Sequence, residues 1–267
     1  MRVLVAGSGD LGSRIAQALQ ASGVVVARIA RRARPEQPEV QALDLSRPVA
    51  GAIQGDYDVL VHCVSPSTRD EAAYRSVYVD ALHHLMAAVP TAGHIVFVSS
   101  TAVYGDHGGA WVDENASCQP AAFNGRVLYE AEQVARSSGR QALVLRLGGI
   151  YGPGREMLLR RVRSGEPLPV SEPPLYTNRV HVDDAAAAAA HLIRRGTAGI
   201  VNLVDDQPTA QPEVLDWLAD RMGLPRLERV PGPRASDNKR VANARLRDSG
   251  YLPRFPDYRA GYADLLR

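Results

Sequence analysis

Glycines at a fixed spacing mark the segment best suited to bind a charged ligand. They lie in the stretch GSGDLG at residues 7–12, which directly follows an apolar run and opens an amphipathic segment, so that it joins a predicted strand to a predicted helix. The first glycine of such a turn permits a tight bend, the second lets a pyrophosphate approach the backbone, and the third lets the helix pack closely on the strand. Unpaired N–H groups at the helix N-terminus add partial positive charge. The residues expected to bind the phosphates of a dinucleotide are Gly7, Ser8, Gly9, Asp10, Leu11 and Gly12. A turn whose glycines serve packing alone is the alternative.

Two adjacent arginines follow the next predicted strand and bear on the choice of dinucleotide. Sites that select NAD carry an acidic residue near the end of this strand, about 20 residues beyond the glycines. Ala30 occupies that position here, Arg31 and Arg32 follow it, and no acidic residue occurs before Glu36. A guanidinium can pair a 2′-phosphate through two parallel hydrogen bonds. The segment therefore favours NADP(H) over NAD(H), although arginines are also ordinary in a solvated loop.

The elements that must position these residues alternate between short β-branched runs and alanine-rich helical stretches. The predicted strands are Arg2–Ala6, Val24–Ile29, Glu39–Leu43, Asp58–Cys63, His94–Ser99, Ala142–Leu147 and Ile200–Leu203. The predicted helices between them are Leu11–Ala21, Glu71–Ala88, Arg126–Ser137 and Asp183–Arg194. Near-continuous apolar strands that alternate with helices indicate a parallel sheet covered on both faces. The predicted fold is α/β, a Rossmann doubly wound parallel sheet of about seven strands. Asp44 and Leu45, just after the third strand, are expected near the adenine.

The amino-acid composition changes after Leu147, and this change predicts a second region. Prolines crowd the segment after it, which indicates irregular backbone around a short helix. Further helices are predicted at Gln211–Met222, Ala242–Ser249 and Tyr258–Leu266. We expect a dinucleotide-binding core formed by residues 1–150 and 177–204, and a small, mostly helical C-terminal cap formed by residues 151–176 and 205–267.

Composition limits the classes of partner. The chain has 267 residues, of which 45% are hydrophobic, and 31 basic and 29 acidic residues give a formal net charge of +2. This balance favours neither a nucleic-acid surface nor a polybasic membrane anchor. No apolar run has the length of a signal peptide core or a membrane span, and two cysteines, Cys63 and Cys118, form neither a disulfide framework nor a zinc site by themselves. We expect a cytoplasmic monomer or homodimer that binds a small-molecule substrate, without nucleic acid or membrane as a partner.

Four segments together resemble one family. They are VFVSSTAVYG at residues 96–105, RLGGIYGPG at 146–154, RVHVDD at 179–184 and VNL at 201–203. In this order they resemble the extended short-chain dehydrogenase/reductases, the group that contains sugar-nucleotide epimerases and dehydratases. The resemblance spans about residues 1–205. It implies a proton-transfer role for Ser100. It also implies that the cofactor is bordered by Val64, Ser65, Ser99, Gly149 and Ile150.

The catalytic pair of that family is missing from this sequence. The family carries a YxxxK motif, in which the tyrosine is the general acid/base and the lysine lowers its pKa. Alignment of the segment Glu130-Ala131-Glu132 with the family's acidic ending puts Asn124 at the tyrosine and Leu128 at the lysine, and the only lysine of the chain is Lys239. Two functions follow. One is an NADP(H)-dependent oxidoreductase or epimerase/dehydratase-like enzyme for a small polar substrate, with an atypical site that includes Ser100 and Asn124. The other is a non-catalytic NADP(H) sensor.

Several further residues leave two interpretations open. Cys63 is either a small buried filler or a reactive thiol, and Asp184 is either a first-turn acid of a helix or a functional group. Glu114 follows the serine loop and is expected in solvent, with a substrate contact as the alternative. The run Asn238-Lys239-Arg240 is either surface charge or a site for an anionic group of the substrate. No histidine has the spacing of a metal ligand, so no metal is expected.

Overall fold

The computed structural model describes residues 1–32, 37–233 and 237–267, so that Glu36 lies outside the described residues. The chain divides into two compact units. The first comprises Met1–Val103, Ala122–Arg146 and Ala186–Val201, and the second comprises Tyr104–Ala121, Leu147–Ala185 and Asn202–Arg267. The chain thus passes between the units several times. The boundaries expected from the sequence stay a prediction.

A seven-stranded sheet forms the centre of the first unit. Its strands are β1 (Arg2–Ala6), β2 (Val25–Ala30), β3 (Val40–Ala42), β4 (Val59–His62), β5 (His94–Ser100), β7 (Gln141–Leu147) and β12 (Gly199–Leu203). They lie in the order β12-β7-β5-β4-β1-β2-β3. The neighbours of β1 are both parallel to it, with Ala6 opposite Ile29 of β2 and His62 of β4. The predicted doubly wound parallel sheet of the α/β class is therefore confirmed.

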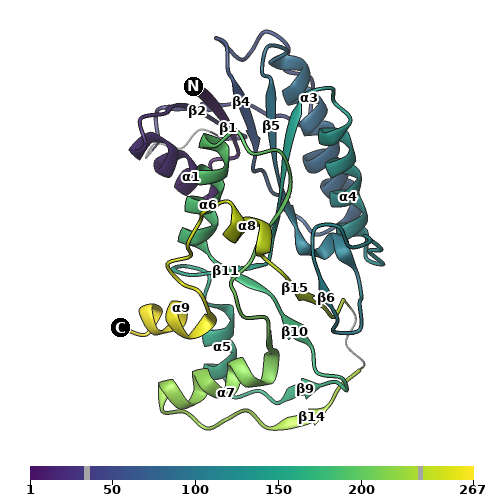
Figure 1. Ribbon diagram of the computed structural model, residues 1–267, viewed down its shortest axis with the longest axis vertical. Coiled ribbons are helices and arrows are strands. Elements are labelled where there is room, and N and C mark those ends of the chain that lie inside the picture. The colour runs from purple at the N-terminus through teal and green to yellow at the C-terminus, as the bar shows by residue number, and fades with distance from the viewer. Residues whose placement is uncertain (33–36, 234–236) are drawn as a thin grey trace. The chain divides into compact units, whose positions relative to one another are not determined.

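Helices cover this sheet on both sides. They are α1 (Asp10–Ala21), α2 (Glu71–Arg75), α3 (Ala81–Ala88), α4 (Phe123–Arg136) and α6 (Val182–Arg194), the last of which begins in the second unit. Figure 1 shows α1 and α6 on one side of the strands and α3 and α4 on the other. Apolar side chains on facing elements fill the space between, as with Leu4, Leu60 and Leu85, none more than 1% exposed. Burial of this kind stabilises the fold by about 1.5–3 kcal/mol for each such side chain.

The single helix predicted over Glu71–Ala88 is wrong in its middle turn. A π-helical turn, Ser76–Asp80, separates α2 from α3. Its backbone explains the difference, because the N–H of Ala81 donates to the carbonyl of Ser76 five residues earlier instead of four. Side-chain periodicity does not register one extra residue in a helix of this length.

A buried ion pair joins the carboxyl ends of two central strands to a covering helix. Arg146 on β7 and Glu132 on α4 are 1% and 0% exposed. The guanidinium donates from Nε to Oε1 of Glu132 at 3.0 Å and from Nη2 to Oε2 at 2.6 Å. The hydroxyl of Ser99, on β5, donates to the same Oε1 at 2.6 Å. The pair therefore fixes β5, β7 and α4 to one another at the end of the sheet that carries Ser100.

The second unit consists of helices and two-stranded β-pairs. Its helices are α5 (Met157–Ser164), α7 (Gln211–Met222), α8 (Ala244–Asp248) and α9 (Tyr258–Leu265). Two-stranded pairs, which the sequence pattern did not predict, accompany them. They are β6 (Trp111–Val112) with β15 (Arg240–Val241), β8 (Gly149–Tyr151) with β11 (Arg179–His181), β9 (Leu168–Val170) with β14 (Arg229–Pro231), and β10 (Tyr176–Thr177) with β13 (Thr209–Ala210). A core that includes Leu159, Leu218 and Tyr262 holds α5, α7 and α9 together.

The helix predicted over Ala242–Ser249 is shorter than expected. It begins at Ala244, because the backbone N–H of Ala242 donates to the carbonyl of Val112 and so extends the β6–β15 pairing.

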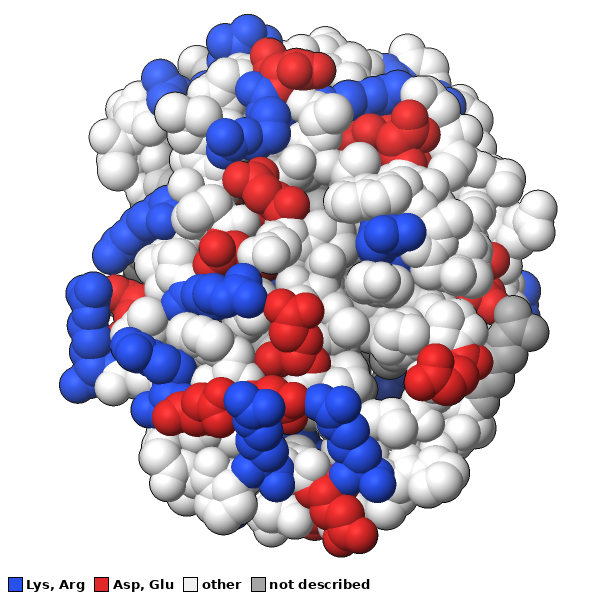
Figure 2. All heavy atoms as spheres, turned by 60° about the horizontal axis from the view of Figure 1, so that its bottom comes forward, with Lys and Arg blue, Asp and Glu red and all other residues white. Residues whose placement is uncertain are grey.

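Charge and hydropathy of the described elements are unexceptional. Across the described ranges, no helix combines the length and apolar character needed to cross a membrane. On the face drawn in Figure 2, acidic and basic side chains alternate and neither sign forms a continuous patch.

We predict that Glu132→Ala destabilises the protein by about 3–5 kcal/mol, because it leaves the Arg146 charge buried without its partner. Glu130, two residues earlier on α4, is the matched control. It forms a bidentate pair with Arg75 at 2.7 Å, but both side chains are exposed, so Glu130→Ala should cost far less. Urea unfolding of the two variants measures the difference. Equal losses would show that the buried pair is not a principal support of the sheet.

Candidate functional site

The three glycines of the first turn differ in what surrounds them. Gly7 has φ of +103°, and a Cβ atom on it would lie 2.2 Å from the carbonyl oxygen of Cys63. A Cβ atom on Gly12 would lie 1.8 Å from the carbonyl oxygen of Gly7, whereas a Cβ atom on Gly9 would meet nothing within 4 Å. Gly7 and Gly12 are therefore required by the fold itself. Gly9 is not, since it has an ordinary φ of −73° and open space in front of it.

A cavity of about 600 Å³ lies against this turn within the first unit. The lining contains nine residues proposed from the sequence as cofactor contacts. These are Gly7, Ser8, Gly9, Arg31, Arg32, Asp44, Leu45, Val64 and Ser65. Of the other proposed contacts in this unit, Asp10, Leu11, Gly12 and Ser99 are not among the lining residues. The structure thus gathers the ends of β1, β2 and β4 and the loop after β3 around one hollow.

Features at the glycine end of the cavity suit an anionic ligand. Gly9 is the N-cap of α1 and supplies no side-chain hydrogen bond to the first turn of the helix. The first N–H groups of a helix have no partner within it. The hydroxyl of Ser8 is also buried without a hydrogen-bond partner among the described residues. A buried polar group in this state calls for a ligand or water.

Charged side chains also line the cavity, namely Arg31, Arg32 and Asp44. Among the described residues, neither Arg31 nor Arg32 forms an ion pair, whereas Arg28 on β2 pairs with Glu39. The backbone N–H of Ser46 donates to Asp44 at 3.0 Å and lowers the pKa of that carboxyl, with smaller contributions from Arg47 and Arg31. Asp44 is therefore a carboxylate that can accept a hydrogen bond. Arg28, on β2, is thus paired with Glu39, whereas Arg31 and Arg32, which follow the strand, line the cavity.

The π-helical turn contributes lining residues that sequence reasoning missed. Ser76 and Val77 both line the cavity, and they belong to the turn between α2 and α3. A π turn inside a helix often marks a functional site. The hydrophobic pattern carries no signal for it.

The proposed catalytic residues lie in the first unit on two elements. Ser100 ends β5, and its hydroxyl accepts a hydrogen bond from the N–H of Ala102 at 3.2 Å. Asn124 lies half-buried in the first turn of α4. Leu128, one turn later at the family's lysine position, is 5% exposed and packs in the interior. The position that usually carries the ammonium group is therefore an apolar contact here.

Gly149 and Ile150 belong to the second unit. They form the start of β8 and pair with Arg179 and Val180 of β11. The N–H of Gly149 donates to the carbonyl of Asn178 at 2.8 Å. Their contact with a cofactor stays a prediction.

Three charged residues that the sequence analysis singled out are buried in the second unit. Glu114 is 6% exposed and accepts a hydrogen bond from the N–H of Asn202 at 2.9 Å. Asp184 accepts from the N–H groups of Arg254 and Phe255, both at 2.8 Å. Lys239 is 3% exposed, and its Nζ donates to the carbonyl of Gly105 at 3.1 Å. The expectations of solvated charge were wrong for Glu114 and Lys239, because each satisfies backbone polar atoms far away in the sequence. Asp184 lies in the first turn of α6, as one of its two interpretations held.

A buried carboxyl with a perturbed pKa also lies in this unit. Asp205 is 3% exposed, and burial raises its pKa to about 8 despite the nearby Arg179. One of its oxygens accepts from the N–H of Gln207 at 3.2 Å, and the other has no partner among the described residues. No sequence motif distinguished it. Within the described part of the chain, no group of three or more His, Cys, Asp or Glu could hold a metal ion.

We predict that Gly9→Val abolishes binding of a dinucleotide and leaves the protein folded. The new side chain projects into the space in front of the turn, and its backbone conformation is available to valine. Gly93→Val is the matched control, because its Cβ atom would also meet nothing within 4 Å but Gly93 does not line the cavity. Calorimetric titration and thermal melting of both variants test this. A folded Gly9→Val variant with normal affinity would place the phosphates elsewhere.

Comparisons with known proteins agree with this arrangement. The model of the NAD dependent epimerase/dehydratase family matches residues 3–203. A 3-diazoavenalumate denitrifying reductase from a Streptomyces species is 29% identical, with 98% of this chain and 99% of the relative covered. Protein YeeZ of Escherichia coli K12 is 28% identical, with 84% of each chain covered. The solved structure of a protein of Methylobacillus flagellatus, assigned as an NAD-dependent epimerase/dehydratase, matches with a TM-score of 0.86 at 36% identity over 99% of this chain and 97% of that one. The chain therefore belongs to the NAD-dependent epimerase/dehydratase family.

Proposed function

We propose that this protein is an NADP(H)-dependent oxidoreductase that acts on a small molecule. The observation that carries the proposal is the cavity of the first unit, which is lined both by the bare glycine turn and by Arg31 and Arg32. Ala30, which also lines it, replaces the acid that would hold a ribose 2′-hydroxyl. When bound, the nicotinamide cofactor would supply or accept a hydride.

The residues around the cavity suit the separate parts of such a cofactor. The open space at Gly9 and the first N–H groups of α1 would hold the pyrophosphate. The two guanidiniums would pair the 2′-phosphate, since guanidinium and phosphate form bidentate, charge-assisted hydrogen bonds. Asp44 would accept a hydrogen bond from the adenine amino group. The family name, which specifies NAD, supports a nicotinamide cofactor and leaves the phosphate preference to these side chains.

The proton-transfer side of the site favours an oxidoreductase over an epimerase. An ordinary epimerase or dehydratase of this family needs a tyrosinate near neutral pH, and Asn124 and Leu128 replace the pair that provides it. Ser100 would orient the reacting group of the substrate through its hydroxyl. A relative named as a denitrifying reductase, similar over 98% of this chain, supports a reduction.

A second function, a non-catalytic sensor of NADP(H), has one observation in its favour. Leu128 is buried where the lysine would be, so the site lacks the group that makes a neighbouring acid reactive. Consumption of NADPH that depends on an added substrate separates the enzyme from the sensor.

We predict that NADPH binds at least about tenfold more tightly than NADH, as expected for one charge-assisted phosphate contact. The double variant Arg31→Ala, Arg32→Ala should lose this preference and keep its NADH affinity. Arg28→Ala is the control, because Arg28 pairs with Glu39 and does not line the cavity, so it should keep the preference. Calorimetric titration of both cofactors gives the ratios. Equal or tighter binding of NADH by the unaltered protein would contradict the assignment.

A further inference from the structure

An arginine stacked on aromatic rings lies in the second unit. The guanidinium carbon of Arg240 lies 5.4 Å from the ring centroid of Trp111 and 4.8 Å from that of Tyr176. Its Nε donates to the carbonyl of Gly109 at 2.8 Å. Stacking covers the face of a guanidinium and leaves its in-plane N–H groups to make hydrogen bonds. With Nε engaged, the donors that remain are on Nη1 and Nη2.

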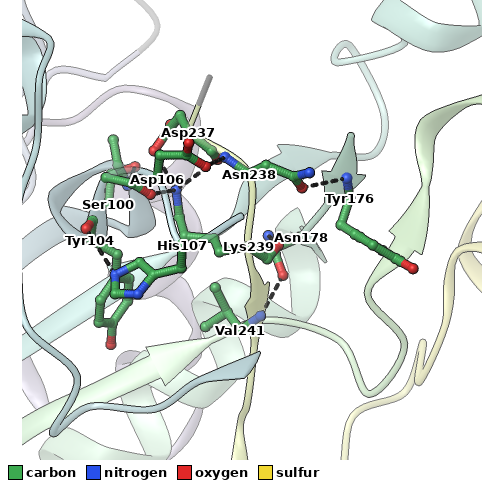
Figure 3. Close-up of polar contacts among 12 residues, drawn as sticks. Ser100, Tyr104, Asp106, His107, Tyr176, Asn178, Asp237, Asn238, Lys239 and Val241 are labelled. Carbon is green, nitrogen blue, oxygen red and sulfur yellow. Dashed lines mark hydrogen bonds and ion pairs between the residues drawn. The ribbon is translucent and has the colours of Figure 1, made fainter. Parts of the chain in front are cut away.

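The backbone around Arg240 is held firmly. Arg240 lies opposite Trp111 in the parallel pair β6–β15, and its N–H donates to the carbonyl of Ala110 at 2.8 Å. Asn238, two residues earlier, accepts from the N–H of Tyr176 at 2.9 Å and donates from its own N–H to Asp106 at 3.0 Å. Figure 3 shows Asn238 between these two partners. Strand β15, which carries the arginine, and strand β10, which carries Tyr176, are thus fixed to each other.

The charges beside Arg240 are already compensated, but the charge of Arg240 is not. Lys239 donates to the carboxylate and to the carbonyl of Asp237, as well as to Gly105. Asp106 accepts from the N–H groups of Asn238 and Gly108. Within the part of the chain that the structure describes, Arg240 has no carboxylate within ion-pair distance. A half-buried guanidinium in this state is a recognition group for an anion.

The aromatic surface next to this guanidinium is open. Trp111 is 54% exposed, which is unusual for so large an apolar side chain. The loop before it contains Gly108 and Gly109, which bring no side chain over the ring, and a Cβ atom on Gly108 would meet nothing within 4 Å. Tyr176 approaches Gly109 closely, since a Cβ atom there would lie 3.4 Å from its ring. An exposed ring beside an unpaired fork of N–H donors fits a ligand with one flat apolar part and one planar anion.

We propose that Trp111, Tyr176 and Arg240 form a binding site for an arylalkyl carboxylate. The carboxylate would accept two parallel hydrogen bonds from Nη1 and Nη2 of Arg240, and the ring would stack on the indole of Trp111. A carboxylate fits better than a tetrahedral phosphate, because one guanidinium edge matches two coplanar oxygens and the adjacent Lys239 is already bonded to Asp237. The binding site stands without the proposed function.

The test uses the full-length protein with Trp217→Phe, so that Trp111 is the remaining tryptophan. The probe is 3-phenylpropanoate, compared with 3-phenylpropan-1-ol, which keeps the ring without the charge. We expect saturable quenching of Trp111 fluorescence by the acid with a dissociation constant on the order of 1 mM, as its size allows. The alcohol should bind at least about tenfold more weakly, the loss of one charge-assisted contact. Equal binding of acid and alcohol would overturn the proposal, as would the absence of quenching by either.

Matched variants locate the effect. Arg240→Met should weaken binding of the acid to the level of the alcohol. Arg221→Met, which removes a guanidinium that lies 5.8 Å from the ring of Trp217 on α7, should change neither affinity. Thermal melting verifies that both variants are folded, and the comparison of acid with alcohol needs no substitution at Arg240. An unchanged affinity in a folded Arg240→Met variant would contradict the assignment of the carboxylate to this residue. Titration with NADPH is a separate measurement, so that a failure of the cofactor assignment and a failure of this site are distinguishable.

Discussion

The close approach of helix α1 to the end of strand β1 is the constraint on which the rest of the first unit depends. Gly12 has no room for a single additional carbon atom, since its Cβ atom would lie 1.8 Å from the carbonyl of Gly7. Gly7 is equally confined against Cys63 of the loop after β4. This contact brings the N-terminus of α1 to the carboxyl edge of the sheet, where the cavity opens. A ligand with a phosphate can reach the helix N-terminus only because the packing there excludes side chains.

A second constraint holds the opposite part of the same sheet. The Arg146–Glu132 pair is completed by the hydroxyl of Ser99, so that one buried cluster joins β5, β7 and α4. These elements carry Ser100 and Asn124. Desolvation makes such a pair costly to bury, and its value lies in the geometry that it enforces. The cluster thus fixes the elements that carry the proposed catalytic residues.

The parts of this structure that follow from local pattern could be predicted, and those that depend on long-range contacts could not. The parallel sheet and the helices on its two sides were predicted because apolar strands and amphipathic helices have different periodicities. The gathering of Gly9, Arg31 and Asp44 around one cavity was expected because the carboxyl ends of parallel strands meet at one edge. The π turn at Ser76–Asp80 was not predicted, because one extra residue barely shifts the periodicity of apolar residues in a helix. The burial of Lys239 was not predicted either. Its ammonium group bonds to nearby Asp237 and also to the carbonyl of Gly105, which is more than a hundred residues away in the sequence.

Hydrogen–deuterium exchange tests whether NADP(H) binds in the cavity, and it does so without altering the protein. Amide exchange would be measured by mass spectrometry with and without saturating NADPH. The account predicts slower exchange in peptides that cover residues 7–12, 43–46 and 63–65, which surround the cavity. Unchanged exchange in these three segments at saturating NADPH, with slowing confined to another part of the chain, would contradict it.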